Sequence, residues 1–202
     1  MALLKMPAAF LAPLPHRHRR GLGWGLAVLL LLAAWLTPRA SAQTAVAREY
    51  QIKAVFLFNF AQFVAWPPAA FTAPDAPLVI GVLGDDPFHH TLDDTVRGEK
   101  IEGRPITIER YRRLEDLRPC HVLFICRSEL ARLDQILARV KGQPVLTVGD
   151  AEGFAQRGGM IRFVSDNNKV RFRINVDAAK AANLTISSKL LRPADIVAPG
   201  KD

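Results

Sequence analysis

The sequence predicts an α/β fold, a three-layer α/β sandwich with a mostly parallel central sheet and an antiparallel C-terminal hairpin. Short continuous apolar runs, typical of strands covered on both faces, alternate with helical patterns as far as Val148. A long aromatic-rich helix over 49–66 comes before them. Two segments nearer the C-terminus alternate polar and apolar residues, which indicates strands with one face in solvent.

Residues 1–42 have the pattern of a cleaved signal peptide. A basic start at 16–20 precedes an apolar run over 26–36, and Ala40-Ser41-Ala42 forms a small-x-small cleavage site. The apolar run is shorter than the ~20 residues that a membrane span needs. We therefore expect export to the periplasm, cleavage after Ala42, and a single domain over 43–202.

Removal of this leader lowers the net charge. The whole chain carries +8, but five of its 27 Lys and Arg and none of its 19 Asp and Glu lie in residues 1–42, so 22 against 19 leaves about +3. The high isoelectric point therefore gives no argument for nucleic acid. No segment interleaves basic and aromatic residues as single-strand binders do, so we expect no nucleic-acid partner.

The helix over 49–66 ends at Pro67, because the residue before a proline is disfavoured in the helical region. Its wide apolar face, expected against the sheet, carries Ile52, Val55, Phe56, Phe60, Phe63 and Val64. Leu57, Phe58 and Trp66 lie outside that face. Since a helix that is apolar almost all round needs cover on more than one side, these three are the candidate partner-binding residues.

The next elements build the parallel part of the sheet. The apolar runs 78–83 and 121–125 indicate buried strands, and the β-branched segment 106–108 indicates a strand between them. A short helix over 88–96 ends at Gly98. Right-handed crossovers then place helices on both faces of the sheet.

The second half of the chain adds a helix, a strand, a hairpin and a final helix. Ser128 is expected as the N-cap of a helix over 129–140, which is followed by a strand over 145–148. The segments 160–163 and 170–174 form the hairpin. The last helix is expected to start at Asn175 or Asp177 and to extend to Leu191.

Two Gly-Asp segments follow predicted strands, and open α/β sheets bind ligands outside the carboxyl ends of their strands. The candidate ligand-binding residues are Gly84, Asp85, Asp86, Gly149 and Asp150. The first segment lacks the Lys-Ser/Thr of a phosphate-binding loop and the third glycine of a dinucleotide site. A tight strand-to-helix turn is the alternative interpretation.

No group of residues indicates catalysis, a metal or a cofactor. His89 and His90 project about 100° apart on a helix, and the Ser-x-Lys spacing at 187–189 lies on an apolar segment without a second catalytic element. Cys120 and Cys126 flank a predicted strand that separates them by roughly 20 Å, too far for a disulfide. We predict free thiols and a non-enzymatic binding protein.

The sequence resembles the YfiR family of periplasmic proteins over nearly the whole mature chain. The resemblance rests on Glu49–Phe60 with Phe63–Pro67, on 80–88, 103–106 and 120–125, and on 158–163, 170–175 and 184–191. The resemblance implies a non-enzymatic regulator that represses an inner-membrane diguanylate cyclase through its periplasmic sensor domain, and so controls cyclic-di-GMP and biofilm formation. It also implies sequestration by an outer-membrane lipoprotein and a homodimer.

The family's namesake has more cysteines, in disulfides tied to its stability, whereas this chain has two. The alternative function is a periplasmic small-ligand-binding protein that serves another sensor or a transport system.

Overall fold

The structure is a computed structural model that describes residues 39–166 and 169–197, with side chains from Thr44 onward. Residues 1–43 form one unit and residues 44–202 a second. The predicted signal peptide lies outside the described residues except for 39–42, whose backbone begins helix α2 (Arg39–Phe63).

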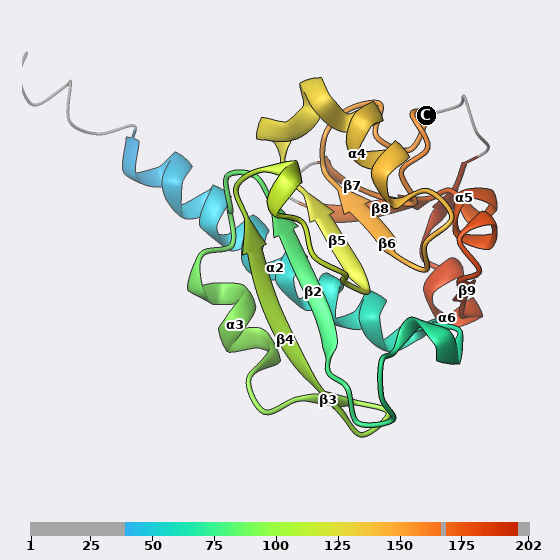
Figure 1. Cartoon of the computed structure of the whole chain (residues 1–202). Coiled ribbons are helices and arrows are strands. Elements are labelled where there is room, and N and C mark those ends of the chain that lie inside the picture. The colour runs from blue at the N-terminus through green and yellow to red at the C-terminus, as the bar shows by residue number, and fades with distance from the viewer. Residues whose placement is uncertain (1–38, 167–168, 198–202) are drawn as a thin grey trace, which may run out of the picture. The chain divides into compact units, whose positions relative to one another are not determined.

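The described part of the second unit contains an eight-stranded sheet in the order β10-β8-β7-β6-β5-β2-β4-β3. Neighbouring strands are parallel from β4 through β2, β5 and β6 to β7, so the predicted α/β class with a mostly parallel sheet is confirmed (Figure 1). The strand bounds are β2 Leu78–Leu83, β3 Lys100–Ile101, β4 Arg104–Tyr111, β5 Val122–Ile125, β6 Leu146–Gly149, β7 Ile161–Asp166, β8 Lys169–Ile174 and β10 Asp195–Ile196.

The sheet separates two cores, because successive strand residues point to opposite faces. The larger core lies under α2, α3 (His90–Val96), α5 (Val176–Ala181) and α6 (Ser188–Leu191). Its strand residues include Leu78, Ile80, Val82, Val122, Phe124, Leu146 and Val148. The smaller core lies under α4 (Leu133–Val140), in front of the sheet in Figure 1, and takes the alternate positions Leu83, Leu123, Ile125 and Val145.

The hairpin of β7 and β8 pairs antiparallel, as predicted, with Phe163 opposite Phe172. It is not the edge of the sheet, because β10 adds a parallel strand outside β8 at Arg173 and Ile174. On the other edge, β3 pairs antiparallel with β4.

The predicted last helix is wrong in its length. Asn175 does cap α5, since its side chain accepts a hydrogen bond from the Ala178 N–H at 3.0 Å. The helix then ends, Asn183 takes φ +57°, and β9 (Thr185–Ile186) pairs with β1 (Val64–Ala65). The short α6 follows, with Ser187 as its cap.

The predicted N-cap at Ser128 is also wrong. The segment Arg127–Arg132 is a 3₁₀ helix, η3, and α4 begins only at Leu133. Ser128 instead accepts a hydrogen bond from the Asp85 N–H at 3.0 Å, which ties η3 to the end of β2.

The face of α2 that packs on the sheet matches the predicted one only in part, since Phe56, Phe60, Phe63 and Val64 contact the larger core but Ile52 and Val55 do not. The buried positions follow a helical period and are Lys53, Ala54, Leu57, Phe60 and Ala61, with Val64 of β1 next. The rings of Phe56 and Phe60 pack against those of Phe163 and Phe172 in the hairpin, mostly in tilted or edge-to-face arrangements, with centroids 5.2–6.2 Å apart. Ile52 and Val55, expected on the covered face, are exposed. Hydropathy does not predict which face of this helix is buried, because apolar residues occur on nearly all of its sides and a lysine, Lys53, is among its fully buried side chains.

Candidate functional site

A buried ion-pair network joins α2 to the carboxyl end of β6. Lys53 has no exposed side-chain surface, and its Nζ lies 2.6 Å from both Asp150 and Glu49. Asp150, itself 1% exposed, also accepts hydrogen bonds from the Tyr50 hydroxyl at 2.8 Å and from Arg127 Nε at 3.1 Å. Two cations and two carboxylates balance within the network, which is the condition under which buried charges are tolerated.

The network holds its acids ionised. Burial by itself raises the pKa of Asp150, but the hydrogen bond and charge of Lys53, with Tyr50 and Arg127, outweigh it and leave that pKa below its usual value. Burial also opposes ionisation of Glu49, and Lys53 and Ser165 likewise lower its pKa overall. Burial and the neighbouring Asp150 charge raise the pKa of Tyr50, so its hydroxyl keeps the proton that it donates.

The candidate Asp150 therefore has a position that explains it, whereas Lys53 was missed as its partner. The signal that could have identified Lys53 is a lysine within an otherwise apolar helix, with Glu49 one turn earlier. The partner across the domain is 97 residues away and gave no local signal.

The other strand-end candidates lie at the carboxyl end of β2, where the Asp85 N–H and the Asp86 carboxylate are engaged within the fold and the Asp85 side chain is exposed. Gly84 takes φ +100°, and a Cβ there would lie 2.4 Å from Ser128 Oγ. Asp86 caps the following turn by accepting from the Phe88 N–H at 2.7 Å, and its second oxygen binds Arg110. This geometry is that of a tight turn closed by η3, the alternative interpretation of the segment.

The two Gly-Asp segments lie on either side of the end of β5, at Cys126. The pKa of the Cys126 thiol is raised by burial and by the acids around it, Asp86 and Asp150 first among them. Burial, helped by Glu109, raises the pKa of Cys120 to about 12. Both cysteines are free and buried, which confirms the predicted thiols and leaves them protonated and unreactive at neutral pH.

Gly149 serves packing. A Cβ on it would lie 2.6 Å from the ring of Phe154, and a Cβ on Gly159 would lie 2.1 Å from the same ring. The two glycines thus accommodate a phenylalanine that is 1% exposed.

The three predicted partner-binding residues differ in exposure. Leu57 is fully buried in the larger core, so the expectation that it needs outside cover does not hold. Phe58 and Trp66 are half-buried and pack against the same core. The sheet and the C-terminal elements supply cover on two sides of the helix, which the local sequence does not reveal.

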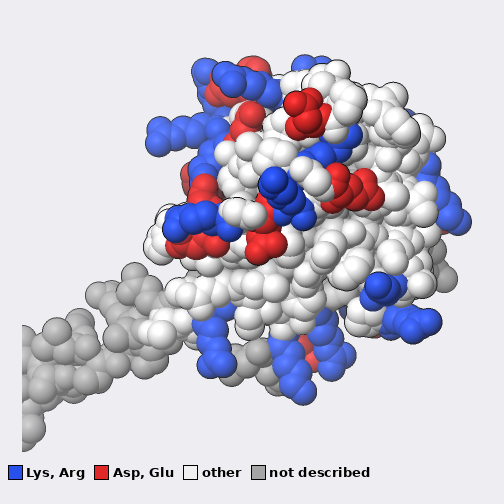
Figure 2. Space-filling model, turned by 90° about the horizontal axis from the view of Figure 1, so that it is seen from below, with Lys and Arg blue, Asp and Glu red and all other residues white. Residues whose placement is uncertain are grey.

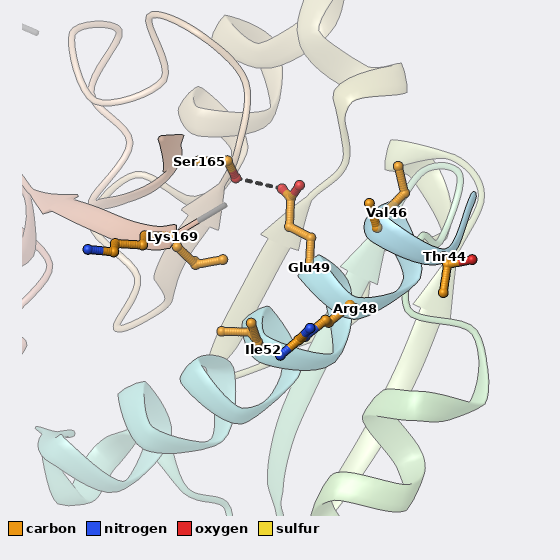
Figure 3. A pocket seen from close by; sticks show the side chains of 9 residues that line it. Thr44, Val46, Arg48, Glu49, Ile52, Ser165 and Lys169 are labelled. Atoms are coloured by element: carbon orange, nitrogen blue, oxygen red, sulfur yellow. Dashed lines mark hydrogen bonds between the residues drawn. The ribbon is translucent and has the colours of Figure 1, made fainter. Parts of the chain in front are cut away.

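Among the described side chains of α2, the large apolar ones left exposed are Val46, Ile52 and Val55, at 53%, 36% and 49%. Val46 and Ile52 line a groove of about 660 Å³ between residues 44–52 of α2 and Ser165, Lys169 and Val170 of the β7–β8 hairpin. Glu49 reaches across this groove to Ser165, to which it is hydrogen-bonded at 2.7 Å (Figure 3).

Trp66 lies at the opposite end of α2, over a buried histidine. Its Nε1 donates to the His121 carbonyl at 3.2 Å. The His121 ring stacks on Phe71, accepts from the Val79 N–H through Nδ1 at 3.0 Å, and lies 3.2 Å from the Ala70 carbonyl through Nε2. Only the tautomer with its proton on Nε2 satisfies both contacts.

Stability should fall as the pH drops below about 6.5, because burial, with Arg104, lowers the pKa of His121 in the fold. Below that pH, His121 is protonated more readily in the unfolded chain than in the folded one. The free energy of unfolding therefore rises with pH in this window. Urea unfolding between pH 5.5 and 7.5 measures it. In His121→Gln we expect a less stable protein with a flatter pH dependence; an unchanged slope would contradict the assignment.

Charges of both signs are interspersed on the face shown in Figure 2, with a broad uncharged area between them, so that face carries no continuous basic surface. Across residues 39–166 and 169–197, no three His, Cys, Asp or Glu side chains converge as metal ligands. No helix in the described part of the chain is long and apolar enough to cross a membrane.

The fold and site are those of a small α/β domain with a charged network under one helix and exposed apolar side chains, Ile52 and Val55, on the outer side of that helix. The YfiR/HmsC-like family matches residues 50–195, and the chain belongs to this family. Its members are periplasmic regulators connected with cyclic-di-GMP signalling.

Comparison with curated proteins gives no match. Among solved structures, the chain is similar to a conserved domain protein from Vibrio cholerae, with 13% identity and a TM-score of 0.44. The alignment covers 59% of this chain and 54% of that one, so this chain spans about half the length of the Vibrio protein.

Proposed function

We propose that this protein binds the periplasmic sensor domain of an inner-membrane signalling protein, a diguanylate cyclase, and holds it inactive. Cyclic-di-GMP synthesis and biofilm formation then follow release of the regulator, for which an outer-membrane lipoprotein is the proposed competitor. The regulator is proposed to be exported, to lose residues 1–42, and to act as a homodimer.

The observation that carries the proposal is the apolar strip of α2, defined as Ile52 and Val55, which lie next to each other on the outward face of the helix. A helix that packs one face into a core normally shows solvent a polar opposite face. Here the outward positions of two successive turns hold Ile52 and Val55, at 36% and 49% exposure. Apolar side chains grouped beside a groove mark a protein contact. Phe58 is proposed as a contact at the border of the strip and Trp66 as a further contact beyond the C-terminal end of α2, whereas Leu57, which is fully buried, is not.

Val55→Glu tests the proposal. A buried carboxylate in the contact is costly, so we expect the variant to lose repression and to raise cellular cyclic-di-GMP to the level of a strain that lacks the regulator. Since Val55 is half exposed, the isolated domain should unfold at nearly the same urea concentration as the wild type.

Gln135→Glu is the matched control, because it adds the same charge at an exposed position of α4, which packs on the opposite face of the sheet from α2. It should repress normally. Normal repression by Val55→Glu, with both proteins present at wild-type amounts, would refute the strip as the contact.

A further inference from the structure

The outer edge of β8 is open next to the groove. The Val197 N–H donates to the Ile174 carbonyl at 3.0 Å, so the polar backbone groups of Ile174 point to the outer edge of the sheet. Backbone direction alternates along an antiparallel strand, so those of Val170 point the same way. Within the described residues, β10 covers β8 only at Arg173 and Ile174. The N–H and C=O of Val170 therefore face outward with no strand beside them.

The side chains at this edge define what fits there. Val170 lines the groove together with Val46 and Ile52. Lys169 and Arg171, on either side of Val170, are exposed, and none of the ion pairs among the described residues engages them. In a strand paired with β8, the residue opposite Val170 would extend over the same face as Val170, and its two neighbours would lie beside Lys169 and Arg171.

From this geometry we propose that the edge at 169–171 binds an extended acidic segment of the partner protein as an additional β-strand. The segment carries an apolar residue opposite Val170, directed into the groove toward Val46 and Ile52. Acidic residues on either side face Lys169 and Arg171. Main-chain hydrogen bonds supply the affinity and the alternating side chains the specificity. The inference rests on the proposed function, since it states how the regulator holds its partner.

A second copy of this chain is the poorer occupant of the edge. Pairing β8 with its own copy would bring Lys169 and Arg171 against the same cations, and like charges directly opposite destabilise a strand pair. Lysine at an exposed edge is a common guard against such self-pairing.

The test uses the mature protein and a short synthetic peptide that alternates glutamate and valine, with a lysine-valine peptide as control. Amide hydrogen exchange of Val170 should be rapid in the free protein and slow when the glutamate peptide is bound. The lysine peptide should give no protection. Affinity should fall with added salt, because the flanking contacts are ionic.

Val170→Pro removes the outward N–H and should weaken peptide binding about tenfold, the scale of one or two lost hydrogen bonds. Proline is tolerated at an edge whose N–H faces solvent, and Val170→Thr, which keeps the N–H, is the matched control. Arg171→Glu should weaken binding without any backbone change.

A Val170 amide already protected in the free protein, no binding of the glutamate peptide, or binding that leaves Val170 unprotected would each overturn the proposal. These measurements need no cyclase. A negative peptide result would therefore not affect the test of the regulatory function by Val55→Glu. A negative result with Val55→Glu would likewise not affect the peptide result.

Discussion

Lys53→Met should be among the most destabilising single substitutions in this domain, lowering the free energy of unfolding by about 3–5 kcal/mol. Methionine fills a similar volume and keeps the helix, so the loss would come from charge. Asp150, at 1% side-chain exposure, would keep its carboxylate but lose its shortest contact, that to Lys53 Nζ at 2.6 Å. Urea unfolding at pH 7 measures the loss.

The pH dependence identifies Asp150 as the cause. Lys53 contributes most to lowering the pKa of Asp150, so in Lys53→Met that pKa moves upward and the carboxyl takes a proton more readily in the folded state. The folded variant then binds more protons than the folded wild type, and the difference in stability between them should shrink as the pH falls from 7 to 5. A constant difference would assign the effect to packing instead.

The double variant Lys53→Met with Asp150→Asn completes the cycle. Its destabilisation should be smaller than the sum of the single effects by about 0.5–3 kcal/mol, because the neutral amide no longer needs the ammonium group. Glu49→Gln is a milder comparison, since Glu49 is 28% exposed and also bonded to Ser165.

Gly159→Ala should be the second large effect, a loss of about 1–3 kcal/mol from overpacking. The added methyl would lie 2.1 Å from the Phe154 ring, which is fully buried and bordered on its other side by Gly149. The Gly159 N–H donates to the Phe154 carbonyl at 2.9 Å, so the backbone turn holds the glycine against the ring and cannot easily move away. Thermal or urea unfolding of the purified domain measures it.

Phe154→Leu supplies the rescue. Leucine vacates the space in front of Gly159, so the double variant should be less destabilised than the two single effects add up to. Gly149→Ala should respond to the same rescue, because its methyl would meet the same ring at 2.6 Å. Strict additivity would mean that the cost of Gly159→Ala comes from the backbone, not from contact with Phe154.

Local sequence patterns predicted single residues of the candidate site but not their contacts with residues far away in the sequence. Asp150 was predicted as a residue at a strand end, because parallel strands place their carboxyl ends on one edge of the sheet. Its partners Tyr50 and Lys53 come from a helix about 100 residues earlier, and their meeting depends on how that helix lies on the sheet. Likewise, Ser128 has the composition of a helix cap, yet it binds the end of β2.

By itself, the sequence determined the alternation of strands and helices, the two-sided burial of the parallel strands and the antiparallel hairpin. Each of these follows from apolar periodicity within a short segment. Tertiary structure alone decided the rotation of α2, which buries Lys53 and Leu57 and leaves Ile52 and Val55 outside. The physical reason is that a helix apolar on nearly all sides has no hydropathic preference for one rotation. The ion pair with Asp150, bridging 97 residues, is consistent only with the observed face.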